Sequence, residues 1–207
     1  MSQRWKRFAG SFSDSKRILT LKADASSVED AEKTIELAMK QFGGIDFLVP
    51  SAGIYQAKPF AEMSDGDWHR TISVNLNGAF YLCKRALPAL KKNDSSIVTI
   101  ASLAAYRGAY VNAHYGATKG AMVSLTRSLF RELAPTTRVN GVAPGIIETP
   151  MINELLKTRM DESISQTPLK RLGKPSDIAS VVAFLCSPAA SFIIGETIQV
   201  NGGIYMA

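Results

Sequence analysis

The chain has 207 residues, of which 46% are hydrophobic and 20% charged, a composition typical of a folded domain with one sizeable core. Its longest apolar runs, such as VVAFLC at 181–186, are far shorter than the ~20 residues that a membrane-spanning helix needs. The net charge is +6, and residues 1–17 contribute +4 of it. A short basic end is usually a solvated helix face, and without a recognised motif it does not indicate nucleic-acid binding.

The N-terminus and the cysteines bear on the compartment. The segment MSQRWKRFAG carries charge with no apolar run behind it, unlike a signal peptide, so we expect a cytoplasmic protein. Cys83 and Cys186 lie in apolar helical contexts, which favours free thiols over a disulfide. His69 and His114 have no second ligand at metal-binding spacing, so no metal site is predicted.

The first part of the chain alternates between strand and helix signals. The apolar runs at 18–22 (ILTLK) and 46–49 (DFLV) predict strands. Between them, Ser27 and Asp30 match a capping box, and apolar residues at helical spacing continue to Gly43, which ends the helix.

The same alternation continues to the C-terminus. The further predicted elements are a helix over 64–87 capped by Ser64 and Asp67, a strand over 96–102, a helix over 112–134, a strand over 138–145, a helix over 175–186 and a strand over 197–203. Strands that are apolar on both faces and alternate with helices predict an α/β fold with a covered parallel sheet. In such sheets, ligands bind beyond the carboxyl ends of the strands.

That edge of the sheet collects several distinctive groups. Ser102 ends one strand, the PSAG turn at 50–53 ends another, and the APGIIET turn at 143–149 ends a third. The helix that follows Ser102 carries Tyr115 and Lys119, which lie four residues apart and therefore on one helix face. A Tyr-x-x-x-Lys pair alone is more often a helix-surface pair, so its meaning depends on these neighbours.

As a set, these motifs resemble the short-chain dehydrogenase/reductase family over residues 18–207. They are Asn75 in SVNLNGAF, Ser102 in ASLAA, Tyr115 and Lys119 in YGATK, VNGVAPGIIETPM at 139–151 and the terminal VNGG. Within the family, the chain looks most like the 3-oxoacyl-carrier-protein reductases. The resemblance implies a Rossmann-type doubly wound parallel sheet in a single domain over 1–207, which transfers a hydride between nicotinamide and a carbonyl or secondary alcohol.

The resemblance also implies the catalytic roles. Tyr115 exchanges a proton with the substrate oxygen, Ser102 polarises the same carbonyl, Lys119 holds the nicotinamide ribose, and Asn75 anchors a water that passes protons to bulk. A phenol with a pKa near 10 needs roughly 4 kcal/mol to titrate near pH 7. An ammonium about 4 Å away supplies about that much at an effective dielectric near 20, so we expect Lys119 to lower the pKa of Tyr115.

Other positions match the family's cofactor-binding segments. Besides Tyr115 and Lys119, these are Asp24, Ala25, Ser51, Ala52, Gly53, Pro144, Gly145, Ile147 and Thr149. Asp24 also fits a turn residue before a helix cap. Pro50 and Ser51 stand where the family has two asparagines, which removes hydrogen-bonding groups from that strand end.

The family's glycine-rich turn, Thr-Gly-x-x-x-Gly-x-Gly, is not in this sequence, which we therefore interpret as N-terminally truncated. The residues that distinguish NAD from NADP belong to the same part, so the choice stays open. Two hypotheses follow. Either the chain is an enzyme of this family, or it is a cofactor-deficient member that acts only as a binding or oligomerisation module.

Partners are predicted from the same resemblance. The substrate is a small carbonyl or alcohol or an acyl thioester, with a 3-oxoacyl thioester first and a sugar or other secondary alcohol second. Small residues line one side of the helix over 112–134, where the family forms a subunit interface, so we expect a homo-oligomer, either a dimer or a tetramer. They are Ala117, Ala121, Ser124 and Ser128.

The final prediction concerns the sheet. In the family's strand order, 3-2-1-4-5-6-7, strands 1 and 2 would be absent, which leaves unpaired edges on strands 18–22 and 46–49. Pairing these two would restore the hydrogen bonds and give a five-stranded parallel sheet. An open gap there would instead favour the enzyme hypothesis.

Overall fold

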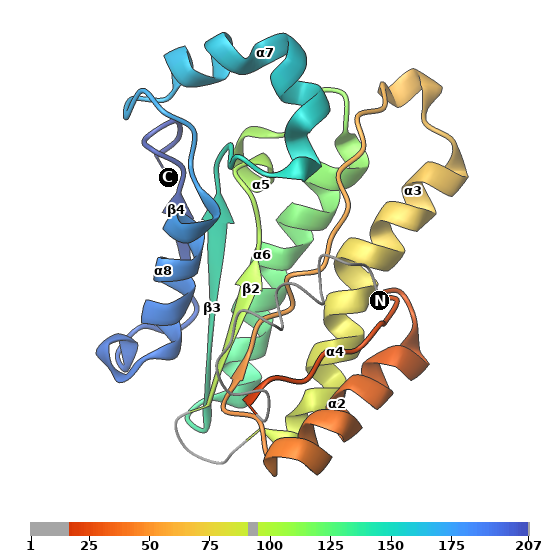
Figure 1. Ribbon diagram of the computed structural model, residues 1–207, viewed down its shortest axis with the longest axis vertical. Helices are drawn as coiled ribbons and strands as arrows, with labels where there is room; N and C mark the ends of the chain where they lie inside the picture. Colours follow the sequence, from red (N-terminus) through yellow and green to blue (C-terminus); the bar gives the residue numbers. More distant parts are fainter. Residues whose placement is uncertain (1–16, 91–94, 207) are drawn as a thin grey trace.

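The computed structural model describes residues 17–90 and 95–206 (Figure 1). Most of the basic N-terminal segment therefore lies outside the described residues. The described strands are β1 (Phe47–Leu48), β2 (Ser95–Ile100), β3 (Thr137–Pro144) and β4 (Thr197–Val200). All pairs are parallel and the order is β1-β2-β3-β4. The predicted α/β class with a parallel sheet is confirmed.

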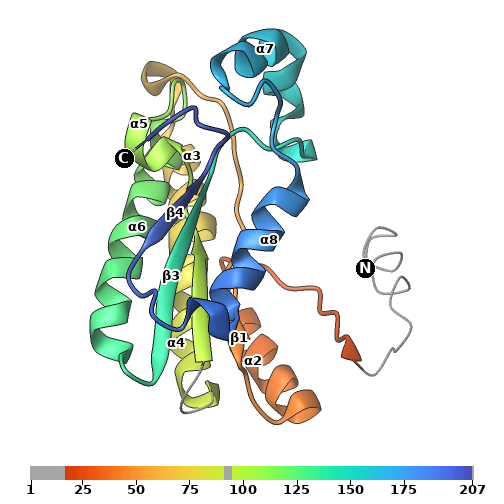
Figure 2. The same ribbon diagram turned by 90° about the vertical axis from the view of Figure 1, so that its left-hand side faces the viewer.

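Helices cover both faces of the sheet. Figure 2 shows α4 (Gly78–Ala86) and α6 (Ala113–Leu133) on one side and α8 (Pro175–Cys186) on the other. Consecutive residues of β2 point to opposite sides, so Ile97 joins a buried cluster with Cys83 of α4, whereas Val98 packs with Leu185 of α8. Both strand faces are thus apolar, as the sequence predicts for a parallel sheet.

Local sequence signals place the helix ends. α2 (Val28–Phe42) ends at Gly43, whose φ of 76° is a left-handed conformation that glycine adopts without steric cost. α3 (Asp65–Ile72) begins with a complete capping box between Ser64 and Asp67. The box predicted at Ser27 is only half formed. Ser27 Oγ accepts from the Asp30 N–H at 3.1 Å, but the Asp30 carboxylate accepts from the Asp24 N–H at 2.7 Å instead.

The predicted strand at 18–22 and its pairing are wrong. Within the described residues, the sheet has four strands, and no ladder joins 18–22 to β1. Figure 2 shows this segment leading away from the sheet. The reason is the docking of α2 on α4: Arg85 and Glu32 pair at 3.1 Å, and the carbonyl of Ala25 packs directly on Gly78. This contact places the segment before α2 against α4, while Ile35 of α2 shares a buried cluster with Leu48 of β1.

Several elements were not predicted. The helix expected over 64–87 is divided by a π-helical turn, η3 (Ser73–Asn77), between α3 and α4. The short helices are α5 (Ala104–Arg107), η2 (Phe60–Glu62), η4 (Leu87–Ala89), η5 (Pro150–Ile152) and η6 (Pro188–Ala190). α7 (Asn153–Gln166) lies beyond the carboxyl ends of the strands and is kinked at Arg159, whose φ and ψ are −135° and 24°.

Two further observations concern the described residues. No helix among them is both long and apolar enough to cross a bilayer. Cys83 and Cys186 are free, as expected, and burial raises the pKa of Cys83 to about 12. A thiol with so high a pKa is unreactive at neutral pH.

Candidate active site

Lys119 lies beneath Tyr115 on α6. Its side chain is only 7% exposed, and its Nζ donates a hydrogen bond to the Ile100 carbonyl at the end of β2, at 2.7 Å. Nζ is 5.6 Å from the centre of the Tyr115 ring. Burial lowers the pKa of Lys119 to about 8, which leaves the ammonium mostly protonated at pH 7.

The environment of Tyr115 differs from the expectation. Burial raises the pKa of Tyr115, a hydrogen bond with Ser102 lowers it, and the nearby Tyr55 phenol raises it further. The rings of Tyr55 and Tyr115 meet edge to face, with centroids 5.0 Å apart. The predicted lowering of the Tyr115 pKa by Lys119 is therefore not found. The shift is caused by burial, Ser102 and Tyr55, and the Lys119 ammonium donates to the Ile100 carbonyl.

Ser102 stands where β2 ends and α5 begins. Its Oγ accepts a hydrogen bond from the Ala104 N–H at 3.1 Å, which orients the side chain at this turn. Ser102 and Tyr115 line the same cleft, and hydrogen bonding by Ser102 opposes the rise of the Tyr115 pKa that burial causes. The structure thus brings together the two hydroxyl groups that the sequence singled out.

Asn75 connects three segments from inside the fold. It lies in the π-helical turn η3, which departs from α-helical spacing, and is 2% exposed. Its Oδ1 accepts from the Ile54 N–H at 2.7 Å, while its Nδ2 donates to the Ile54 carbonyl at 2.9 Å and to Thr118 Oγ1 at 3.3 Å. The carboxamide therefore satisfies the backbone after the PSAG turn, where Pro50 and Ser51 lack the family's asparagines. It also holds that segment next to the residue before Lys119.

A cleft of about 850 Å³ opens at the carboxyl ends of β2 and β3, with residues of α7 in its lining. Its lining comes from the segments 55–57, 102–104, 107–112 and 145–146, from Tyr115 and Ile204, from the apolar residues Met151 and Ile152 of η5, and from the polar side of α7. This is the position where parallel α/β sheets bind ligands. Lys119 and Asn75 lie behind this surface and are not part of the lining.

The segment after β3 contributes to two cavities. Gly145 lines the cleft, whereas Ile147 forms a bridge to Gly173 and lines a smaller cavity of about 210 Å³. Pro144 ends β3 with its carbonyl bonded to the Leu103 N–H at 2.8 Å, and Thr149 precedes η5. The four predicted residues of this segment thus lie near the cleft but do not face one surface.

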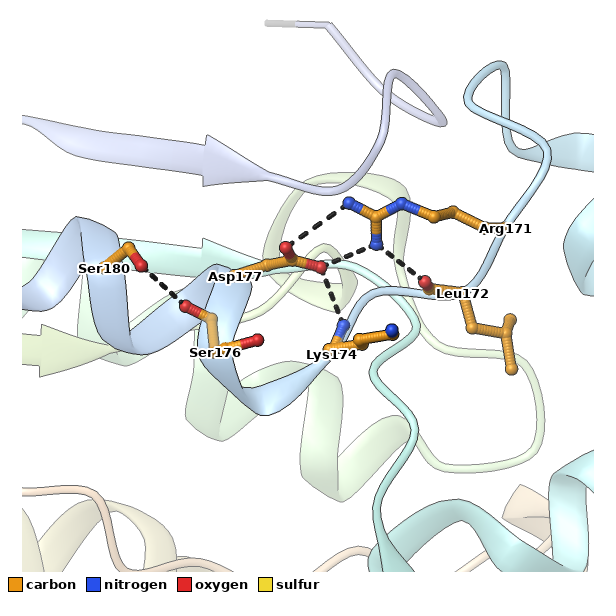
Figure 3. A network of polar contacts seen from close by, with 6 residues as sticks. All are labelled: Arg171, Leu172, Lys174, Ser176, Asp177 and Ser180. Atoms are coloured by element: carbon orange, nitrogen blue, oxygen red, sulfur yellow. Dashed lines mark hydrogen bonds and ion pairs between the residues drawn. The ribbon is translucent and has the colours of Figure 1, made fainter.

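A polar network surrounds Gly173, the residue that bridges to Ile147 in the segment after β3. Figure 3 shows Arg171 and Asp177 paired at 2.7 Å, with the Asp177 carboxylate also accepting from the Lys174 N–H at 2.8 Å at the start of α8. This network lies directly beside Gly173, whose N–H donates to the Ile146 carbonyl at 3.0 Å. We infer that it stabilises the turn after β3 from behind, as a structural support.

The remaining predicted cofactor residues lie outside the cleft lining. Asp24 is exposed, and its carboxylate accepts bonds from the N–H and Oγ of Ser26 at 2.8 and 2.7 Å, as its alternative role as a turn residue requires. Ala25 packs on Gly78. Ser51 and Ala52 are exposed, and Gly53 passes close to the Asn75 carboxamide. None of these five residues lines the cleft that contains Tyr115.

Lys119 provides a test of whether a nicotinamide nucleotide fits. An ammonium has three N–H donors, and the Ile100 carbonyl accepts only one. The other two N–H groups of the Lys119 ammonium remain available beside Tyr115, and two neighbouring ribose hydroxyls could accept hydrogen bonds from them. The residues present therefore fit the nicotinamide–ribose end of the cofactor.

Comparison with known proteins agrees with this geometry. The family model described as "Enoyl-(Acyl carrier protein) reductase" matches residues 2–205. The chain belongs to the short-chain dehydrogenase/reductase family. Its members include the 3-oxoacyl-[acyl-carrier-protein] reductases of Buchnera aphidicola, 38% identical over 90% of this chain and 77% of that protein, and of Aquifex aeolicus, 41% identical over 86% and 73%.

Solved structures support the same assignment. A short-chain dehydrogenase/reductase from Brucella melitensis, titled glucose/ribitol dehydrogenase, is 81% identical with a TM-score of 0.96, over 98% of this chain and 82% of that one. The ligand-free aldohexose dehydrogenase of Thermoplasma acidophilum is 34% identical with a TM-score of 0.85, over 89% and 77%. As a member of this short-chain dehydrogenase/reductase family, the protein is an NAD(P)-dependent oxidoreductase.

Of the cleft lining, the sequence analysis singled out only Ser102, Tyr115 and Gly145. Among the lining residues that it missed are Tyr55, Asn112, Arg159 and Glu162. Tyr55 follows the PSAG turn by two residues, so its place beside a predicted ligand-binding turn was a usable signal. Arg159 and Glu162 have the i,i+3 spacing of any helix-surface ion pair, and nothing local marks them as cleft residues.

Proposed function

We propose that the protein interconverts a carbonyl and a secondary alcohol in this cleft, with Tyr115 as proton donor and acceptor and Ser102 as the hydrogen-bonding group for the reacting oxygen. The observation that supports this assignment best is that Tyr115 and Ser102 line one cleft, which lies at the carboxyl ends of β2 and β3. A substrate oxygen placed between them accepts two hydrogen bonds while charge develops on it.

The proton movements follow from the environment of each side chain. NAD(P) supplies or accepts the hydride. A raised pKa keeps Tyr115 protonated at neutral pH, so in the reductive direction it is ready to donate to the oxygen. In the oxidative direction the phenol must lose its proton, and the cationic Lys119, together with an oxidised nicotinamide, favours the phenolate. Asn75 holds the Ile54 backbone and anchors the water through which protons reach bulk solvent.

Cofactor contacts are proposed on the same basis. Lys119 and Tyr115 bind the ribose, and Gly145 with Pro144, Ile147 and Thr149 lies along the nicotinamide. Ser51, Ala52, Gly53, Asp24 and Ala25 belong to the adenosine side. NAD and NADP remain alternatives. We also propose a single domain that assembles into a homo-oligomer through the small residues on one side of α6, of which Ala117, Ser124 and Ser128 are exposed and Ala121 is half-buried.

Relatives indicate two substrate classes. The curated relatives are named 3-oxoacyl-carrier-protein reductases, whereas two solved relatives carry sugar or polyol names. A 3-oxoacyl thioester and a sugar or small secondary alcohol are accordingly the two candidates.

Steady-state rates test the proposal. The purified protein is assayed with NADPH and NADH against acetoacetyl-CoA, and with both oxidised cofactors against a panel of sugars and polyols. Cofactor-dependent turnover of at least one panel member is expected. Absence of turnover in both directions, together with absence of cofactor binding in calorimetry, would contradict it and support the binding-module hypothesis.

A further inference from the structure

The α7 side of the cleft carries an ordered ion pair. Arg159 Nε lies 2.7 Å from Glu162 Oε2, and Arg159 Nη2 lies 2.9 Å from Glu162 Oε1, so the guanidinium and carboxylate pair through two parallel bonds. Gln166 Nε2 adds a bond of 2.9 Å to Glu162 Oε1. The kink of α7 falls at Arg159 itself. Both charged residues, and Gln166, line the cleft that contains Tyr115.

The pair also interacts across the cleft. The Arg159 guanidinium lies 5.9 Å from the centre of the Tyr110 ring, which belongs to the loop before α6. Hydrogen bonding by Glu162 raises the pKa of Arg159, and the Tyr110 and Tyr55 phenols add to the same effect. Tyr55, whose ring meets that of Tyr115, lines the same cleft as the ion pair. An ordinary ion pair on a helix surface contacts only solvent, whereas this pair lines a cleft and lies next to the Tyr110 ring.

The charges in the cleft are balanced. Its charged lining residues are Arg107, Arg159, Glu154 and Glu162, which sum to zero. A cleft built for an anion carries excess positive charge, whereas these four charges cancel, and Glu162 binds two of the five N–H donors of Arg159. Neutral ligands are therefore favoured over anionic ones at this wall.

We infer that Arg159 and Glu162 are specificity-determining residues that bind neighbouring hydroxyl groups of a neutral polyhydroxylated substrate, a sugar or polyol. This inference rests on the proposed function and selects between its two substrate classes. One substrate hydroxyl donates to the Glu162 carboxylate and the next accepts from the Arg159 guanidinium. The side chains are 43% and 46% exposed, so substrate hydroxyls replace water at both groups. An alkyl chain would remove that water and offer no hydrogen bond in return.

Asn112 supports a polar ligand independently. It is 1% exposed at the start of α6 and lines the same cleft. Within the described parts of the chain, its Nδ2 has no hydrogen-bond partner. Since buried amides are usually satisfied, a ligand oxygen is a suitable acceptor for it.

The test compares Glu162→Gln with Asp161→Asn. Both remove one negative charge from α7, but Asp161 does not line the cleft. With ribitol and D-glucose as substrates, Glu162→Gln should raise KM about tenfold or more and change kcat less than about threefold, because it weakens binding of a hydroxyl remote from the reacting oxygen. Asp161→Asn should leave both constants unchanged. With acetoacetyl-CoA, the two variants should behave alike.

Direct binding separates this inference from the proposed function. Calorimetric titration of the cofactor-loaded protein with ribitol and D-glucose needs no turnover. Loss of sugar or polyol affinity in Glu162→Gln, with cofactor affinity unchanged, would support the inference even if no substrate of the panel is turned over. Equal affinity and equal KM in wild type and Glu162→Gln would overturn it, as would turnover of acetoacetyl-CoA alone with no polyol binding. Either result leaves the roles of Tyr115 and Ser102 intact.

Discussion

The two walls of the cleft are built in opposite ways. Behind the β2–α6 wall, polar side chains that do not line the cleft are bonded to the backbone of other elements: Lys119 of α6 to the Ile100 carbonyl, and Asn75 of η3 to both groups of Ile54. On the α7 wall, Arg159 and Glu162 bond to one another within one helix and stay almost half exposed. The first wall is fixed by the tertiary fold, whereas the second depends on a single helical turn.

This difference suggests that proton transfer takes place at the β2–α6 wall and that the α7 wall recognises the substrate. Proton transfer needs groups held in one geometry, which bonds to a buried backbone provide. Substrate recognition tolerates exchange of side chains on an exposed helix, since little else depends on them. Substitutions on the β2–α6 wall should therefore reduce turnover or stability, whereas those on α7 should change substrate preference.

The largest expected effect is on turnover. Tyr115→Phe removes only the phenolic hydroxyl, so kcat should fall by roughly 10²–10⁴ while the fold is retained. Tyr106→Phe is the matched control, because its ring packs on Tyr205 and does not line the cleft. Initial rates and thermal melting of both variants check this. Near-normal rates in Tyr115→Phe would contradict the assignment of Tyr115 as the proton donor and acceptor.

Burial of Lys119 should appear as a pH-dependent stability. The folded protein has a Lys119 pKa of about 8, whereas an unfolded lysine titrates near 10.4. Between these values the unfolded chain binds more protons, so the contribution of Lys119 to the free energy of unfolding rises with pH by about 3 kcal/mol. Below pH 8 Lys119 is protonated in the folded protein, so burial of its charge lowers the free energy of unfolding by the full amount.

Urea unfolding of wild type and Lys119→Met between pH 8 and 10.4 measures this. The difference isolates Lys119 from other groups that titrate in the same range. Wild type should gain stability relative to the variant as pH rises. Parallel curves would show that Lys119 is not desolvated as the structure indicates.

Substitution of Asn75 tests how much its hydrogen bonds to the Ile54 backbone contribute to stability. Asn75→Ala leaves the buried N–H and carbonyl of Ile54 without their side-chain partner, which should lower the free energy of unfolding by about 2 kcal/mol. Asn77→Ala, two residues further along the same turn, should change stability by less than about 0.5 kcal/mol. Equal effects in denaturant titration would mean that the carboxamide does not hold this wall.

A pair of glycines gives the smallest effect. A Cβ at Gly78 would collide with the Ala25 carbonyl, so Gly78→Ala should destabilise the protein by about 1–2 kcal/mol. At Gly120 of α6 a Cβ has open space, so Gly120→Ala should stabilise it by about 0.5–1 kcal/mol. Melting temperatures of the two variants are the measurement, and shifts of the same sign would contradict the close docking of α2 on α4.

Features that depend on neighbouring residues in the sequence were predicted correctly, whereas features that depend on contacts between distant segments were not. Helix ends marked by local groups, such as Gly43 and the Ser64–Asp67 box, were predicted correctly. α7 was not predicted, since it has no side-chain cap and a kink interrupts its pattern at Arg159. The strand at 18–22 was predicted from its composition, yet a strand exists only where a partner provides a ladder.

The same division applies to the site. Spacing along α6 was enough to predict that Tyr115 and Lys119 share a helix face, because that relation depends only on helical geometry. The direction of the Tyr115 pKa and the partner of the Lys119 ammonium depend on burial and on the Ile100 carbonyl, which only the packing of α6 against β2 provides. The family motifs in the sequence thus identified the reactive groups, whereas tertiary contacts determined their protonation and the polar wall that faces them. Desolvation and contacts between distant segments have no local signature along a chain.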